Sequence, residues 1–547
     1  MPQTDDTTIL LGLIAATVFL LNSLYKPQPL VHPILLGRQS DVARVRNPGE
    51  SAVYRNYSTG LMGRFPLRPA KDVHILADML RPDSDAARIL WSTKIANPAL
   101  QDRVAAFGTG LLRLAGLEPG ESNVLVLLND CLEFIVADLA LASHSIPSFT
   151  LTATNLLALV LESHPPSAII THAFMLPQIL ELIYDAGEHN RNHTVIVVGD
   201  PSPQVMATVA SKVKVLKFSD LEREGVRVEK ILSPVPKPSD VFTVSFFSTE
   251  SGQIQGAQLT HENLTAGVAA VRALMPLAHA FSPLDTIVSA HSMSTAYGRA
   301  IAYTALFEGT SFATLDSSKL FREDESSPQI GLKDALSARS YPVPPTTIAF
   351  VKPGHLTALV DAILTQARKK FLLFPLAWRH KVAGIAEGFL NKESLWDRLV
   401  FDAARAHVAG DGSAALRGVI VSGGPIPGDC LRPARAALSV PIINCFSHPL
   451  VAGPVLASHA LDLQDLGLPT AHSGPPSVNV EVKLVGVVDD LVEEGGDPRG
   501  VLMVRGPSVG KLSSMEGSYV SIPSGEEEWM GTGEHASVLA NGAFVLE

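Results

Sequence analysis

Short, continuous apolar runs constrain the fold of this chain more than any other feature. Val124–Leu128 reads VLVLL and Val195–Val198 reads VIVV, with no alternating polar positions. Such runs are typical of parallel strands that are covered by helices on both faces. Turn residues and helical stretches separate them from similar runs at Ala168–Ile170, Val241–Phe247, Thr286–Ser289, Thr347–Phe350, Gly418–Val421 and Pro441–Ile443. The sequence therefore predicts the α/β class, with parallel sheets.

The length of 547 residues predicts three or four compact units, at roughly 150 residues per domain. We expect a first α/β subdomain over 86–285 and a second over 286–459. From about residue 460 to residue 547, apolar residues alternate with polar ones, as in Val478, Val480 and Val482, which indicates a small β subdomain. Residues 27–85 are rich in Pro, Arg and Gly and predict an irregular N-terminal segment.

The amino terminus contains an apolar run from Ile9 to Leu21. We expect residues 1–26 to form a single membrane anchor, with the large domain in the cytosol because basic residues follow the run. The endoplasmic reticulum or another lipid-metabolising organelle is the expected membrane. A signal peptide and a buried helix are the alternatives. Asp5 and Asp6 argue against the signal peptide, because its first region is normally basic.

Charge and cysteine content exclude several functions. The net charge is −11, so nonspecific nucleic-acid binding, which depends on Lys and Arg, is not expected. Only three cysteines occur, which argues against a disulfide-built secreted domain. The sequence has no CxxC pair and no HExxH, and we predict no metal site from these signatures.

Three segments carry candidate chemistry. Val244–His261 predicts a strand, a loop rich in Ser, Thr and Gly, and a helix that begins near Thr260. Such a loop can cradle phosphate with backbone N–H groups and hydroxyls, although a plain surface loop has the same composition. The other segments are Gly418–Pro425 followed by Val440–Phe446, and Gly531–Phe544.

The order and spacing of these segments resemble the adenylate-forming superfamily, and within it the long-chain acyl-CoA synthetases. Leu117–Leu151, Ser289–Asp316, Leu416–Pro427 and Gly500–Val509 are also similar to blocks of that family. The resemblance implies that ATP, Mg²⁺ and CoA are cofactors or co-substrates, and that a fatty acid or acyl-CoA is the ligand. The acid would first be joined to AMP, and the CoA thiol would then attack the activated carbonyl.

The resemblance also implies the nucleotide-binding positions. They are Ser248, Ser251, Gly252 and Gly256 for phosphate, Phe446 for adenine and Glu534 for ribose, with Gly424 as a further cofactor-binding position.

Other positions depart from the family pattern. Glu250 replaces a phosphate-binding threonine, and Gln255 replaces a lysine. Pro449 replaces a threonine, and Leu450 stands where the family has a magnesium-binding glutamate. Leucine offers no oxygen to a hard cation. The sequence stops before the family's C-terminal lid, which we expect to be absent from this chain or encoded downstream.

Two functional hypotheses follow. The chain is either a membrane-anchored acyl-CoA synthetase, or a non-catalytic relative that binds a fatty acid, an acyl-CoA or a partner enzyme. We expect the acyl pocket between a sheet and the helices after residue 291, with Ile301–Phe307 and Phe371–Phe374 as candidate lining, although both segments also suit an ordinary core. His261, His291 and His355 are expected to be structural or to line the pocket.

Overall fold

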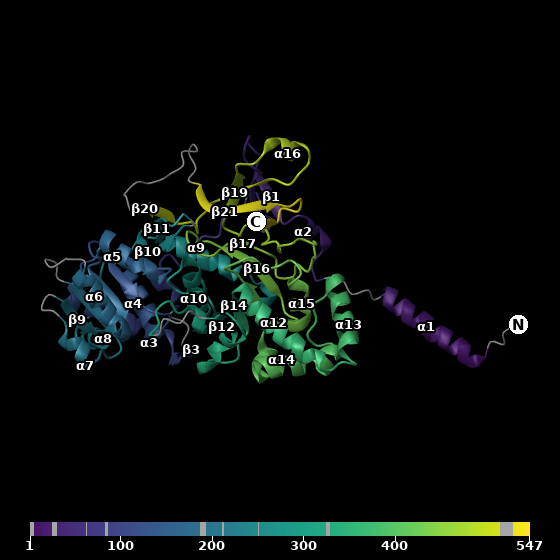
Figure 1. The fold of residues 1–547 in the computed structure, drawn as a ribbon, viewed down its shortest axis with the longest axis horizontal. Helices are drawn as coiled ribbons and strands as arrows, with labels where there is room; N and C mark the ends of the chain where they lie inside the picture. The colour runs from purple at the N-terminus through teal and green to yellow at the C-terminus, as the bar shows by residue number, and fades with distance from the viewer. Residues whose placement is uncertain are drawn as a thin grey trace.

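The fold is described from a computed structural model. It describes residues 5–24, 30–61, 63–81, 86–185, 193–209, 213–249, 251–323, 329–514 and 529–547. Within these ranges the strands form three sheets, two of them mainly parallel (Figure 1). The predicted α/β class is confirmed.

The first sheet has the strand order β20-β11-β10-β6-β5-β7-β8-β9. The pairs from β10 to β9 are parallel, and the pairs β10–β11 and β11–β20 are antiparallel. Its strands are β5 (Val124–Leu127), β6 (Ser148–Leu151), β7 (Ala168–His172), β8 (His193–Val198), β9 (Val213–Lys217), β10 (Val241–Ser248), β11 (Ile254–Thr260) and β20 (Lys511–Ser514).

The second sheet has the order β17-β16-β15-β14-β12-β13-β3-β4 and is parallel from β16 to β3. Its strands are β3 (Arg88–Leu90), β4 (Thr93–Ile95), β12 (Thr286–Ser289), β13 (Ser311–Thr314), β14 (Ile348–Val351), β15 (Gly418–Val421), β16 (Ile442–Ser447) and β17 (Pro454–Ala457). The chain turns back at β12, since β13 lies on one side of this strand and β14 on the other.

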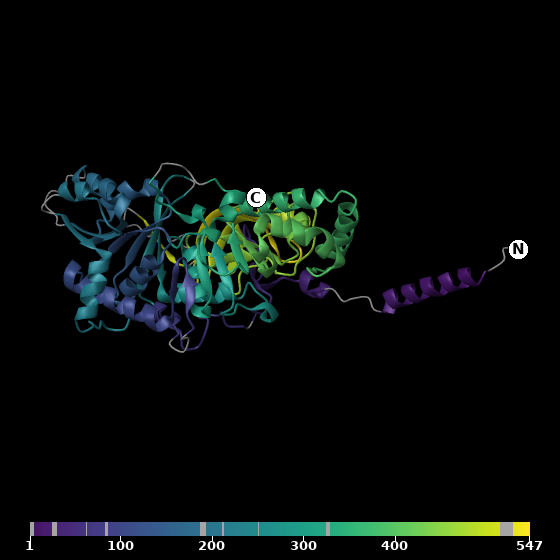
Figure 2. The same ribbon diagram turned by 90° about the horizontal axis from the view of Figure 1, so that it is seen from below.

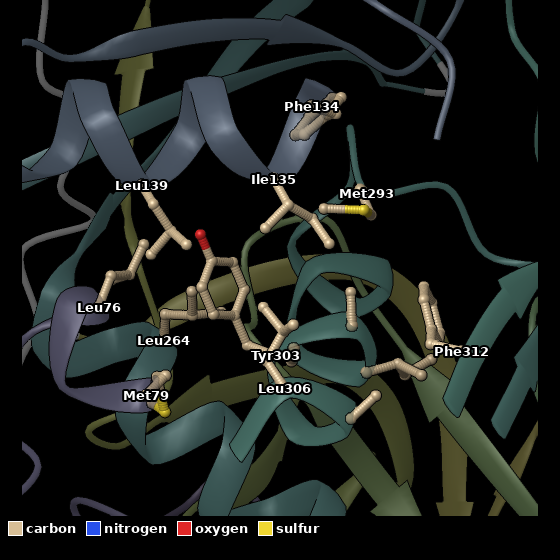
Figure 3. Packing of buried hydrophobic residues seen from close by; sticks show 14 of the residues in the cluster. Leu76, Met79, Phe134, Ile135, Leu139, Leu264, Met293, Tyr303, Leu306 and Phe312 are labelled. Carbon is tan, nitrogen blue, oxygen red and sulfur yellow. The ribbon is translucent and has the colours of Figure 1, made fainter. Parts of the chain in front are cut away.

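A layer of helices lies between the two sheets. α4 (Leu132–Ser143), α9 (His261–Arg272) and α10 (Ala296–Glu308) share one apolar cluster with side chains of both sheets, including Val124 and Phe350. α4 is mostly apolar, and its residues from Phe134 to Ala142 are buried, Asp138 included, which suits a helix in the centre of a layer. Figure 3 shows Ile135 and Leu139 of α4 facing Tyr303 and Leu306 of α10.

Other helices cover the remaining sheet faces. α5 (Leu157–Ser163) and α6 (Leu176–Asp185) pack on the outer face of the first sheet, while α3 (Asn97–Gly110) and α8 (Phe218–Arg227) extend the inner layer. The outer face of the second sheet carries α12 (Pro353–Arg368), α13 (Phe374–Ala386), α14 (Asp402–Ala409) and α15 (Leu431–Leu438). Shorter helices include α2 (Pro33–Gly37), α7 (Pro203–Ala207), α11 (Leu332–Ala335) and α16 (Asp489–Glu493).

The third sheet is antiparallel and joins the two ends of the chain. Its order is β1-β2-β18-β19-β21-β22, from β1 (Ser40–Arg44), β2 (Val53–Asn56), β18 (Glu481–Val485), β19 (Arg499–Arg505), β21 (Met530–Val538) and β22 (Phe544–Leu546). The sheets therefore cross the predicted boundaries. Residues 40–56 are strands of the C-terminal sheet, β3 and β4 belong to the second sheet, and β20 closes the first.

The N-terminal prediction requires a correction. α1 (Asp6–Leu24) is separate from the body of the molecule in both views (Figures 1 and 2). Among the described residues, no helix combines the length and apolar character needed to cross a membrane. The membrane anchor over 1–26 is not supported, and the cellular location stays a prediction.

Candidate functional site

The Ser/Thr/Gly-rich loop is the tip of the β10–β11 hairpin. The Thr249 amide donates to the Gln253 carbonyl over 2.9 Å, and the Gly252 amide donates to the Thr249 carbonyl over 2.9 Å. The Thr249 and Ser251 hydroxyls are bonded to each other at 2.8 Å. The loop therefore satisfies several of its own polar groups. α9 begins at His261 with Thr260 as its N-cap, where the sequence predicted a helix start. The strand β11, which was not predicted, lies between the loop and this helix, so the helix N-terminus is not at the loop.

The described loop residues supply no cation. Ser248, Ser251 and Gly252 are exposed, and Gly252 has φ +77°, which favours glycine. Gln255 is half-buried on β11, opposite Phe247 of β10 and Ser514 of β20. Glu250 lies outside the described residues.

Gly256 has a packing role in the hairpin. A Cβ atom at this position would lie 2.8 Å from Cγ1 of Val244 and 3.3 Å from Cε1 of Phe246. The missing side chain therefore lets β11 fit over the side chains of β10. Phosphate binding by Gly256 stays a prediction.

The three sequence segments converge around His448. Its ring lies 6.1 Å from that of Phe247 beside the hairpin loop and 6.5 Å from that of Phe446 at the end of β16. Burial lowers the pKa of His448 to about 4, against a hydrogen bond with the Thr532 backbone that raises it. The imidazole is therefore neutral at pH 7, and its Nδ1 accepts from the Leu450 amide at 3.3 Å.

Leu450, which stands where the family has a magnesium-binding glutamate, has apolar surroundings as well. The Leu450 side chain is 1% exposed and packs in a cluster with Phe247, Phe446 and Val451. Within the described ranges, no group of three or more His, Cys, Asp or Glu side chains is arranged to hold a metal ion. The residues present do not fit the Mg²⁺ ion that the family resemblance implies at this position.

The ribose segment lies on β21, next to His448. The Thr532 hydroxyl donates to the Leu502 carbonyl over 2.9 Å and accepts from the Glu534 amide over 3.2 Å. Glu534 is half-buried, and Gly533 beside it has φ +81° with open space around its Cα. This segment retains a carboxylate beside a glycine within β21, which is compatible with binding sugar hydroxyls.

A second polar cluster lies where the strand order of the second sheet reverses. His291 follows β12, Lys352 follows β14, and Ser422–Gly424 follows β15, so all of them lie at the carboxyl edge of the sheet, where α/β proteins often bind ligands. The Ser422 hydroxyl is 2.9 Å from Nε2 of His291. Gly424 has φ +153°, and its role in cofactor binding stays a prediction.

The cluster of His291, Lys352 and Ser422–Gly424 combines the neutral imidazole of His291 with the ammonium group of Lys352. Burial, with Lys352 and His355 nearby, lowers the pKa of His291 to about 3. Burial also lowers the pKa of Lys352, while Asp334 raises it. Lys352 was not among the site residues predicted from the sequence. The one sequence signal for it is its position directly after the apolar run that forms β14.

A cavity of about 410 Å³ lies on the outer face of the second sheet, beneath α12 and α14. Most of its lining is aliphatic, as in Val288, Ala349, Leu356, Leu359 and Val419. Its volume is in the range of about 300–1,000 Å³ that is typical of small-molecule sites.

The cavity lies between the second sheet and helices that follow residue 291, where the sequence placed the acyl pocket, but its lining differs from the expected one. Ile301–Phe307 belongs to α10, whose residues there are buried in the central layer. Phe371 and Leu372 are 73% and 72% exposed. Neither segment lines the cavity, because the α10 residues are buried between the sheets and Phe374, at the start of α13, packs against other side chains of the outer helices. Of the three histidines, His355 lines the cavity.

Comparisons with known proteins identify the family of this chain. The family model described as "AMP-binding enzyme" matches residues 94–512. The chain is 24% identical over 466 residues to long-chain-fatty-acid–CoA ligase 5 of Mus musculus, covering 83% of this chain but only 63% of that protein. It is 23% identical over 538 residues to the peroxisomal long chain acyl-CoA synthetase 6 of Arabidopsis thaliana, with 91% and 70% covered.

Solved structures support the same fold. A long-chain-fatty-acid–CoA ligase from Archaeoglobus fulgidus aligns with a TM-score of 0.60 at 14% identity, over 88% of this chain and 84% of that one. The N-terminal domain of FACL13 from Mycobacterium tuberculosis aligns with a TM-score of 0.56 at 13% identity, over 86% of this chain and 99% of that one. With the family model spanning most of the sequence, the chain belongs to the AMP-binding enzyme family.

Proposed function

We propose that this chain is a fatty acid–CoA ligase-like protein that binds a long-chain acyl compound but forms acyl-adenylate poorly. The observation that carries the proposal is a contrast within one molecule. The aliphatic cavity beneath the second sheet is large and open to a ligand, whereas the nucleotide segments have apolar or uncharged residues at key positions. The names of the relatives supply the expected ligand class, a long-chain fatty acid.

The electrostatics of the nucleotide segments support the second part of the proposal. Stabilising a leaving pyrophosphate requires cations or preorganised donors close to its charges. Among the described residues of the hairpin, Gln255 contributes no charge, and Thr249 and Ser251 bond each other. Leu450 is enclosed by apolar side chains and has no oxygen for a metal.

A second candidate, an active acid–thiol ligase, is favoured by the ribose segment. No hydrogen bond or ion pair of the Glu534 carboxylate occurs within the described part of the chain, which leaves it available to sugar hydroxyls. The two candidates differ in the expected affinity for MgATP, which is weak for the first and tight for the second.

Titration calorimetry on the full chain tests the proposal. We expect hexadecanoate to bind and MgATP to bind more weakly than a Kd of about 1 mM, with no palmitoyl-CoA formed from hexadecanoate, ATP and CoA. Tight, Mg²⁺-dependent ATP binding with thioester formation would support the second candidate instead. Absence of hexadecanoate binding would reject the acyl-binding part.

Two variants sharpen this test. Gln255→Lys restores a cation beside the loop, and adding Leu450→Glu restores an oxygen ligand, so the double variant is expected to bind MgATP at least tenfold more tightly than the wild type. The matched control is Gln255→Met with Leu450→Gln, which changes side-chain shape without charge. Because Leu450→Glu buries a carboxylate, thermal unfolding is recorded for each variant, and Gln255→Lys alone is measured as well.

A further inference from the structure

The cavity beneath the second sheet has two ends with different chemistry. Pro345 and Leu416 precede β14 and β15, so they mark an outer end at the amino edge of the sheet. His355 marks the inner end, near the carboxyl edge where His291 and Lys352 lie. A ligand with one polar head and a long tail can therefore enter in two orientations.

The outer end carries a cation without a partner. Arg339 lines the cavity and is exposed, and no hydrogen bond or ion pair of its side chain occurs in the part of the chain that the structure describes. Its guanidinium lies against Gly410, the residue that ends α14 with φ +70°. A Cβ atom at Gly410 would come within 2.8 Å of Nη2 of Arg339, so the glycine gives the guanidinium room at the mouth.

The other arginine of the cavity lining, Arg405, is paired with groups of the protein itself. Arg405 is 3% exposed and donates to Asp397 over 2.8 Å, to Asp402 over 2.9 Å and to the Ala437 carbonyl over 2.7 Å. Its charge is compensated, and it anchors α14 to α15. Arg339 is thus the cation of the lining that remains available to a ligand.

The inner end disfavours an anion. His355 is 1% exposed, its Nε2 is 2.6 Å from Oδ2 of Asp334, and its Nδ1 accepts from the Lys352 amide over 3.1 Å. Burial alone would raise the pKa of Asp334, but hydrogen bonds from Ser317 and His355 outweigh that effect. The pKa of Asp334 is therefore below its ordinary value, and the carboxylate is ionised at neutral pH. The Lys352 ammonium offsets part of this charge from outside the cavity.

We infer that the cavity is a site for an unesterified long-chain carboxylic acid, with the carboxylate on Arg339 and the hydrocarbon tail toward His355. The inference rests on the proposed acyl binding and adds the orientation and the head group. A planar guanidinium binds a carboxylate through two parallel N–H···O bonds. In this orientation the carboxylate lies at the amino edge of the sheet, away from His291 and Ser422–Gly424. The acid is held with its reactive group turned away from the nucleotide segments.

Binding measurements with hexadecanoate and methyl hexadecanoate on the full chain test this orientation. The two probes share a tail, and only the acid has a charge. We expect the wild type to prefer the acid by at least tenfold, as one charge-assisted contact allows. Arg339→Ala should remove this preference and leave ester binding unchanged, while Arg339→Lys should retain part of it. Arg379→Ala, an exposed arginine on α13 outside the cavity, is the matched control.

A cavity-filling variant separates this inference from the proposed function. Ala349→Phe places a ring in the cavity and should weaken acid and ester together. If Ala349→Phe weakens both probes but Arg339→Ala leaves the acid preference intact, acyl binding stands and the orientation is wrong. Equal weakening of both probes by Arg339→Ala, with a lowered Tm, would mean that Arg339 only stabilises the fold, and would overturn the inference. If Ala349→Phe changes neither affinity, both proposals fail.

Discussion

At the scale of single residues, burial keeps several imidazoles neutral so that they accept hydrogen bonds from the backbone. His261 is 2% exposed, and its Nδ1 accepts from the Leu76 amide over 3.2 Å. His172 accepts from the Asn129 amide over 2.9 Å. Burial lowers the pKa of each of these two side chains to about 4. The histidines therefore join segments of the fold, as the sequence suggested for His261.

The pH dependence of stability follows from this. Since the folded pKa of His261 is about 4 and its ordinary value is 6.5, the unfolded chain binds more protons between these pH values. The stabilisation is complete above pH 6.5 and is lost as the pH falls toward 4, by on the order of 3 kcal/mol for this group. His261→Asn keeps an acceptor without a titration, so its unfolding free energy should fall less steeply in urea titrations from pH 7.5 to pH 4.5. His172 is present in both the wild type and the variant, so its contribution to the pH dependence of the unfolding free energy cancels in the comparison. Identical pH profiles would contradict the assignment.

At the scale of elements, a buried polar contact fixes α4 against α10. The Tyr303 hydroxyl donates to Asp138 over 2.8 Å, and Nε of Arg299 lies 3.6 Å from the same carboxylate. All three side chains are at most 2% exposed. Apolar helices slide over one another at little cost, whereas a buried carboxylate requires its partners in place. The contact therefore sets the register of the layer that supports both parallel sheets.

Removing one hydroxyl tests that contact. Tyr303→Phe leaves the Asp138 carboxylate short of a donor and should lower the unfolding free energy by about 1–3 kcal/mol in urea denaturation. Tyr57→Phe, at a 41% exposed position, should change it by less than about 0.5 kcal/mol. A Tyr303→Phe variant as stable as the control would show that the contact contributes only packing.

At the scale of the whole molecule, the third sheet ties residues near the start of the chain to its last strands. The Ser51 amide donates to the Leu484 carbonyl over 2.8 Å, and Nζ of Lys483 lies 2.5 Å from Glu50. Arg55 pairs with Glu481 at 3.0 Å. β2 therefore covers the edge of β18, next to the strand that leads to the ribose segment.

Two truncations distinguish the N-terminal parts. Removing residues 1–29 takes away α1, which is separate from the body, and should leave the Tm within a few degrees. Removing residues 1–60 also removes β1 and β2 and exposes the hydrogen-bonding edge of β18, which favours aggregation. Thermal unfolding and light scattering measure both effects. Equal behaviour of the two truncations would mean that β1 and β2 contribute little to the third sheet.

The sequence alone determined the fold class and the positions of several buried strands. Runs such as Val124–Leu127 and Gly418–Val421 lie where parallel strands were expected, because a strand buried on both faces needs uninterrupted apolar residues. It also located the three segments that meet around His448. Local composition was sufficient for these features, since each depends on neighbouring residues in the chain.

Only the tertiary structure decided which segments became partners. Nothing near residues 40–56 indicates that they pair with β18, because that pairing depends on an edge formed more than 400 residues later. The cavity arises in the same way, from Val288, Arg339 and Gly410, which are distant in sequence. The apolar residues of α10 and those of the cavity wall are alike in composition. Packing alone determines that the first fill the core between two sheets and the second surround a cavity.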